Sequence, residues 1–198
     1  MPTTRTASGE ATRQKLLEAS YHLITSRGYH ATSMRDIASE AGITAGSIYN
    51  HFSDKEQIVK EVLLAYHPIV KVMPVLEQAE GQSVSELVHD AAHRIMREIE
   101  ASPGILNLLY IELIELNGEH LEELIGTIFP LVQGFLERVY SSGENIRPQD
   151  PLIFFRSLIG QLLGYSLTRA SVAAIPAGQG QEAKLDDFVD IFLHGVLE

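Results

Sequence analysis

The 198-residue sequence contains no cysteine. This absence excludes disulfide scaffolds, thiolate chemistry and cysteine-based metal sites, and it fits the reducing cytoplasm, where we expect the protein to act. Long apolar runs are also missing. The most apolar stretch, LIFFRSLIGQLLGYSL, carries Arg156 and Gln161 and is too short to span a bilayer. The first residues, MPTTRTASGEATRQ, lack the apolar region of a secretory signal, so we expect neither export nor membrane insertion.

Positive charge is scarce overall, because the formal net charge is −11. The imbalance is uneven along the chain. Residues 1–67 hold seven Lys and Arg against seven Asp and Glu, whereas residues 68–198 hold eight against nineteen. Only the first part could therefore approach a polyphosphate without strong repulsion.

Patterns of catalytic residues are missing too. We find no nucleophile–base pair, no glycine-rich phosphate loop and no paired catalytic carboxylates, so we predict no enzyme activity and no cofactor. His89 and His93 stand one helical turn apart, a spacing that can grip a metal ion. They have no obvious third ligand, and the prediction is no metal site, with metal binding by this pair left open.

Strand-like alternation is almost absent, and apolar residues instead recur at intervals of three and four. The sequence predicts an all-α fold of about nine helices. The fourth runs from Asp54 to Pro68, and the shift in charge after His67 places a domain boundary within it. The segment ILNLLYIELIEL, residues 105–116, is apolar nearly all round and is predicted to be a buried helix.

The stretch AGITAGSIYNHFSDKEQ, residues 41–57, predicts a helix-turn-helix. Gly42 stands where the chain must reverse, a position that favours positive φ. Thr44 is placed to cap a short helix from Ala45 to His51 or Phe52. Ala45 and Gly46 leave the start of that helix nearly bare, which lets it approach a duplex groove with its N-terminal residues toward the bases.

Tyr49, Asn50 and His51 lie between Ile48 and Phe52 in the sequence. They cannot all face inward if Ile48 and Phe52 do. The Tyr49 hydroxyl and the His51 imidazole can reach phosphate oxygens, and Asn50 can pair with an adenine edge or a phosphate. The alternative is that Tyr49 and His51 only surround the small core.

The run TSMRDIASEAGITAGSIYNHFSDKEQI resembles the DNA-binding domain of the TetR family of bacterial transcriptional regulators. The resemblance covers about a quarter of the chain at fixed spacing. Its matching residues are Ile37, Ala38, Ala41, Gly42, Ile43, Thr44, Gly46, Tyr49, His51, Phe52, Lys55 and Glu56. Ser20 and Ile24 stand where the family usually has alanine and phenylalanine.

This resemblance implies a three-helix DNA-binding domain over residues 1–58, followed by a helical ligand-binding and dimerisation domain over residues 59–198. The residues that it implies for phosphate contacts are Thr32 or Ser33, Arg35, Thr44, Tyr49, His51 and Lys55. Those nearest the bases are Ala45, Gly46, Ser47 and Asn50. The domain is neutral, unlike most DNA readers. We therefore expect about four cationic contacts per protomer, from Arg5, Arg13, Arg35 and Lys55, and a salt-dependence slope of about −7 for a dimer.

In the family the last two helices pair with their copies in a four-helix bundle. Here the penultimate helix carries a row of small residues, and the last helix carries two phenylalanines. The predicted dimer residues are Ser157, Gly160, Gly164, Thr168, Phe188 and Phe192. The alternative is that these residues form an intramolecular core.

The middle helices of TetR-like proteins enclose an inducer pocket. The candidate lining residues here are Tyr66, His67, His89, His93, Asn107, Tyr110, Glu112, Glu115 and Tyr165. Glu112 and Glu115 interrupt the apolar segment, and a buried carboxylate needs a partner. Arg94, Arg97 or a cationic ligand could supply it, and an internal ion pair or simple exposure is favoured over a ligand.

These observations predict a homodimeric regulator that binds double-stranded DNA and is released as a repressor by an unidentified small molecule. One alternative is an activator or a regulator without an effector. Another is an all-α small-molecule-binding protein whose helix-turn-helix is vestigial.

Overall fold

A computed structural model describes residues 7–102, 104–143, 145–173 and 184–197. Within them the predicted all-α fold is confirmed, since the only strand-like pairing is one antiparallel bridge between Ile146 and Leu197. The chain divides into two compact units. Unit 1 comprises residues 1–71 and 102–127, and unit 2 comprises residues 72–101 and 128–198.

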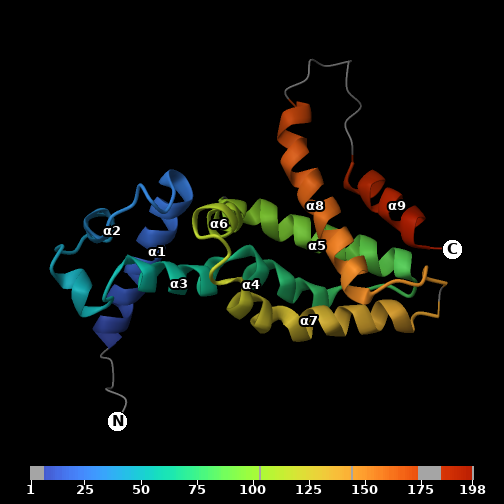
Figure 1. The fold of residues 1–198 in the computed structure, drawn as a ribbon, viewed down its shortest axis with the longest axis horizontal. Helices are drawn as coiled ribbons and strands as arrows, with labels where there is room; N and C mark the ends of the chain where they lie inside the picture. Colours follow the sequence, from blue (N-terminus) through green and yellow to red (C-terminus); the bar gives the residue numbers. More distant parts are fainter. Residues whose placement is uncertain (1–6, 103, 144, 174–183, 198) are drawn as a thin grey trace, which may run out of the picture. The chain divides into compact units, whose positions relative to one another are not determined.

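Unit 1 contains the helix-turn-helix and a later segment of the chain (Figure 1). Its elements are α1 (Ala7–Arg27), α2 (Met34–Glu40), the 3₁₀ helix η1 (Ser47–Asn50), α3 (Lys55–Tyr66), most of α4 (Pro68–Val72), α6 (Ile105–Tyr110), the π-helix η3 (Ile111–Glu115) and the start of α7 (Leu121–Ser141). Two of these helices, α2 and α3, begin at capping residues. Ser33 accepts a hydrogen bond from the Asp36 amide at α2, and Asp54 accepts one from the Gln57 amide at α3.

One hydrophobic core joins the elements of unit 1. Leu16 and Leu23 of α1, Ile37 of α2 and Ile58 of α3 are buried in it. Two residues from the later segment, Leu108 and Ile111, belong to the same core. The predicted boundary between residues 58 and 59 falls inside α3, so the compact unit around the helix-turn-helix is larger than residues 1–58. The functional division at that boundary stays a prediction.

The prediction of a buried helix over residues 105–116 is only partly correct. Ile105 and Leu108 are buried, but Ile114 is 72% exposed. The backbone changes from α-helix to π-helix at Ile111. A π turn carries more residues than an α turn, so it changes which residues face the core. The apolar run is therefore longer than the buried face.

Unit 2 is built around α5 (Val84–Ala101), α8 (Pro151–Ala173) and α9 (Leu185–Val196), with the 3₁₀ helix η2 (Met73–Gln78) and most of α7. Figure 1 shows α8 and α9 side by side, and both pack on α5. Arg138 of α7 donates to the carbonyls of Leu76 and Ala79, which fastens α7 to the end of η2. Among the described helices, none has the length and apolarity needed to cross a bilayer.

Candidate nucleic-acid interface

The turn of the helix-turn-helix has the predicted geometry. Gly42 has φ of +70°, a left-handed conformation that favours glycine. The Ile43 amide donates to the Ala38 carbonyl at 2.9 Å, which closes the end of α2. The helix that follows is shorter than predicted. A 3₁₀ helix spans only Ser47–Asn50, and the Ser47 amide at its start donates to both the hydroxyl and the carbonyl of Thr44.

The side chains of this short helix divide between core and surface as expected. Ile48 and Phe52 are fully buried, whereas Tyr49 is 59% exposed and Asn50 is exposed. A β-carbon added at Gly46 would meet no atom within 4 Å, so the surface before η1 is open. The remaining predicted reading residues lie along the same stretch: Thr44 and Ala45 are exposed, and Ser47 and His51 are partly buried. Contact with DNA stays a prediction for all of them.

The start of α2 offers two accessible groups. Ser33 and Arg35 are exposed. Ser33 and Asp36 form a reciprocal capping box, and the hydrogen bonds from Ser33 lower the pKa of the Asp36 carboxyl. Thr32 is different, because it is buried and its hydroxyl donates to the Gly28 carbonyl at 2.9 Å. Of the pair Thr32 and Ser33, only Ser33 is exposed, and its contact with a phosphate stays a prediction.

Lys55, at the start of α3, bonds to the protein itself. Its ammonium donates to the carbonyls of Tyr29 and Thr32, at 2.9 and 3.0 Å, and lies over the Tyr29 ring. Burial lowers the pKa of Lys55, an effect opposed by the Glu115 carboxylate. These contacts give Lys55 a structural role, and the phosphate contact that the resemblance implies stays a prediction.

Arg13 was expected to contact phosphate, but it is buried. Its guanidinium donates to the His51 carbonyl at 2.7 Å, pairs with Glu61 and lies over the Phe52 ring. The expectation is therefore wrong. The signal was present in the sequence, because Arg13 stands three residues before Leu16 on the buried face of α1.

Six of the candidate pocket residues lie in unit 1. Asn107 and Tyr66 hydrogen-bond to α1, Asn107 to the Thr25 carbonyl at 2.9 Å and Tyr66 to the Gln14 side chain at 3.0 Å. His67 is fully buried, and both its Nε2 and the Tyr110 hydroxyl are buried without a hydrogen-bond partner.

The two carboxylates of the apolar segment both have partners within unit 1. Glu112 is fully buried, and it accepts from the His120 amide at 2.6 Å and lies 3.1 Å from His120 Nδ1. The suggestion of Arg94 or Arg97 as its partner is wrong, because the internal partner is His120, eight residues later and beyond the π-helix. Glu115 is partly buried and accepts from the His30 amide at 3.2 Å.

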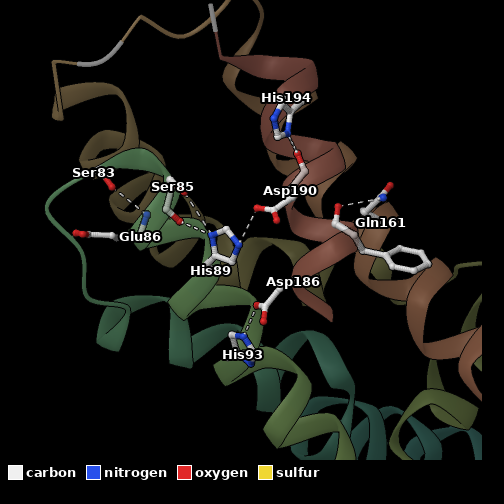
Figure 2. A network of polar contacts seen from close by, with 10 residues as sticks. Ser83, Ser85, Glu86, His89, His93, Gln161, Asp186, Asp190 and His194 are labelled. Atoms are coloured by element: carbon white, nitrogen blue, oxygen red, sulfur yellow. Dashed lines mark hydrogen bonds and ion pairs between the residues drawn. The ribbon is translucent and has the colours of Figure 1, made fainter. Parts of the chain in front are cut away.

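The other three candidates lie in unit 2. Figure 2 shows His89 and His93 of α5 facing α9, where each pairs with an aspartate. His89 Nε2 lies 3.2 Å from Asp190, and His93 Nε2 lies 2.7 Å from Asp186. Among the described residues, no group of three or more His, Asp or Glu side chains could hold a metal ion. Tyr165 packs edge-on against Phe188. Through their aspartate partners, His89 and His93 connect α5 to α9.

The predicted dimer residues separate into surface and interior. On α8, Ser157, Gly160 and Thr168 are exposed and Gly164 is partly exposed. On α9, Phe188 is partly buried, whereas Phe192 is buried and packs edge-on against Phe154 of the same subunit. The exposed large apolar residues on α8 and α9 that the sequence did not single out are Leu152, Ile153, Leu167 and Ile191.

Comparisons with known proteins agree with this geometry. The family model described as bacterial regulatory proteins, tetR family, matches residues 16–62. The HTH-type transcriptional regulator YvkB of Bacillus subtilis is 24% identical over 189 residues, 93% of this chain and 97% of its own. The HTH-type transcriptional repressor KstR2 of Mycolicibacterium smegmatis is 51% identical over 51 residues, 26% of this chain and 25% of its own.

The fold agrees as well. A crystal structure described as a tetR family transcription regulator from Shewanella sp. PV-4 matches with a TM-score of 0.73 at 18% identity, covering 98% of this chain and all of the other. At this identity the structural likeness shows the fold alone. The family model and the curated relatives place the helix-turn-helix in the same family. Residues 16–62 therefore match the DNA-binding region of the TetR family, and the chain as a whole is similar to TetR-family transcriptional regulators.

Proposed function

We propose that the protein is a homodimeric repressor that binds an operator in duplex DNA and leaves it when a small molecule binds. The observation that carries the proposal is the outward face of η1. Tyr49 and Asn50 are exposed there while Ile48 and Phe52 fill the core, and Gly46 leaves open space beside them. KstR2, whose name describes a repressor, is similar over a quarter of the chain.

Each protomer presents one short reading element, and such elements act in pairs about 34 Å apart or at multiples of that distance. The face of α8 supports pairing. Its exposed or partly exposed Ile153, Ser157, Gly160, Gly164 and Leu167 recur at intervals of four and three residues, the spacing of a helix that packs along another helix. On α9, Ile191 is 66% exposed. A partner subunit on this face would remove these side chains from water.

The operator can be found by selecting duplexes from a random library with the purified protein. We expect a selected site with two related halves, and sedimentation of the complex should give two protomers per site or a multiple of two. Asn50→Ala should relax the base preference within each half-site, because an asparagine reading adenine contributes about 1–3 kcal/mol of discrimination. A protein that selects no sequence would contradict the proposal.

Two buried groups in unit 1 support the binding of a ligand. The Ile69 amide donates to Nδ1 of His67 at 3.3 Å, so the ring proton must lie on Nε2, which has no acceptor. The Tyr110 hydroxyl is likewise buried without a partner. An unsatisfied buried polar group costs about 1–3 kcal/mol, so a ligand that offers an acceptor would gain that energy.

The proposed mechanism is a population shift. The ligand favours a state in which the helix that begins at Lys55 is tilted, which takes the two reading elements out of register. A coupling free energy of about 1–3 kcal/mol would lower DNA affinity about 5- to 150-fold. A screen of metabolites by thermal shift, followed by operator binding at saturating ligand, tests it. If every ligand that binds leaves operator affinity unchanged, the protein is not ligand-released.

A further inference from the structure

Two segments far apart in the sequence meet at the link between α1 and α2, residues 28–33. The Asn107 side chain donates to the Thr25 carbonyl at 2.9 Å, and the Glu115 carboxylate accepts from the His30 amide at 3.2 Å. Thr25 lies in the last turn of α1, where carbonyls lack partners within the helix. Asn107 therefore caps α1, and Glu115 holds the chain just beyond it.

The same link is held from α3. Lys55 donates to the carbonyls of Tyr29 and Thr32, whereas Glu115 accepts from the amide of His30. A cation bonded to carbonyls and an anion bonded to an amide both have the favourable polarity. Burial lowers the pKa of Lys55 and the Glu115 carboxylate opposes that shift, so the two charges act on each other across the link.

The segment that carries Asn107 and Glu115 is itself fixed. Leu108 and Ile111 are buried in the core of unit 1, and Glu112 is anchored by two contacts to His120. The approach to the link is close. A β-carbon at Gly28 would lie 3.0 Å from the Glu115 carboxylate, and Gly28 also has φ of +88°. The glycine at position 28 thus leaves room for the Glu115 carboxylate beside the link.

The link leads directly into Ser33, the N-cap of α2, and then to Arg35. We propose that Asn107 and Glu115 are positioning residues for operator binding, which hold the start of α2 where Ser33 and Arg35 reach phosphates. This inference rests on the proposed function. It adds that residues 105–116 act on α2 directly, through their own side chains.

The test uses full-length Asn107→Ala and Glu115→Ala on a fluorescent duplex selected from a random library by the wild-type protein. We expect each variant to bind this duplex about 5- to 50-fold more weakly and to change binding to a random duplex less than about twofold. A shift in the start of α2 would misplace the phosphate contacts that fix the protein on its selected site, whereas the charge that drives non-specific binding would be unchanged. Hydrogen exchange at the His30 amide should become faster in Glu115→Ala. Glu115→Gln, whose amide oxygen can still accept from that amide, should retain most of the affinity.

Glu122→Ala removes an exposed carboxylate from the first turn of α7 and controls for the change in charge. If Glu115→Ala unfolds, Asn107→Asp keeps the size and loses the donor, and it must show the same loss. Wild-type affinity in folded Asn107→Ala and Glu115→Ala would overturn the inference. A wild-type protein that selects no duplex would instead contradict the proposed function.

Discussion

The guanidinium carbon of Arg13 lies 4.0 Å from the centre of the Phe52 ring. Arg13 belongs to α1 and Phe52 follows η1, so this contact ties the first helix to the reading element. The guanidinium also bonds to the His51 carbonyl and to Glu61 of α3. Arginine suits such a place, because its planar group can stack and donate at once. The positive charge of Arg13 is therefore used in contacts within the protein, although it lies near the proposed DNA surface.

Arg13→Ala should destabilise the protein by about 1–3 kcal/mol, because it removes a stacked cation and leaves Glu61 and the His51 carbonyl without their donor. Urea unfolding measures the loss. Arg13→Lys should recover only part of it, since one ammonium cannot replace the fork. Unchanged stability with reduced DNA affinity would return Arg13 to the phosphate role that the sequence suggested.

The salt dependence of operator binding should be shallower than the sequence alone predicts. Arg13 is buried, and Lys55 is bonded to the carbonyls of Tyr29 and Thr32. Arg5, outside the described residues, and Arg35 remain as proposed cationic contacts. Two per protomer give a slope of about −4 for a dimer in a plot of log affinity against log salt. A measured slope near −7 would mean that Lys55 and one further cation also reach phosphates.

Stability should depend on pH through His67. Burial lowers the pKa of His67 to about 4 from 6.5. Between these values the unfolded chain binds a proton that the folded chain does not, so the free energy of unfolding falls as the pH decreases. The loss from this group approaches about 3 kcal/mol below pH 4 and vanishes above about pH 7.

Urea unfolding of the wild type and of His67→Phe from pH 4.5 to 7.5 isolates this effect. Carboxylates such as Asp36 and Asp54, whose pKa values are lowered by hydrogen bonds, contribute to both proteins and cancel in the difference. The difference in unfolding free energy should shift in favour of His67→Phe as the pH falls. A difference that stays flat over this range would contradict neutral burial of His67.

Local rules predicted the local features well. Positive φ at Gly42 follows from the reversal that the chain must make there, and the outward face of η1 follows from the spacing of Ile48 and Phe52. Long-range partners could not be predicted in this way. The pairing of Glu112 with His120 depends on a π-helix, and the attachment of Glu115 to His30 spans 85 residues. The spacing of apolar residues shows which face of a helix is buried, but it does not show which other residues that face contacts.

The glycines of α8 allow a direct test of the proposed dimer. A β-carbon added at Gly160 or Gly164 meets no atom within 4 Å in the subunit. Replacing a helical glycine also improves helix propensity by up to about 1 kcal/mol, so Gly164→Glu should fold as a subunit. In a symmetric dimer it would bring like charges together at a close helix contact, which costs several kcal/mol.

We therefore expect Gly164→Glu to weaken dimerisation at least about 100-fold in sedimentation equilibrium, and to reduce operator affinity accordingly. Gly134→Glu is the matched control. Gly134 is exposed with open space around it, and the substitution adds the same charge on α7 instead of on α8 or α9. It should remain a dimer. If Gly164→Glu is also dimeric at micromolar concentration, α8 does not form the interface, and the exposed Ile153, Leu167 and Ile191 need another partner.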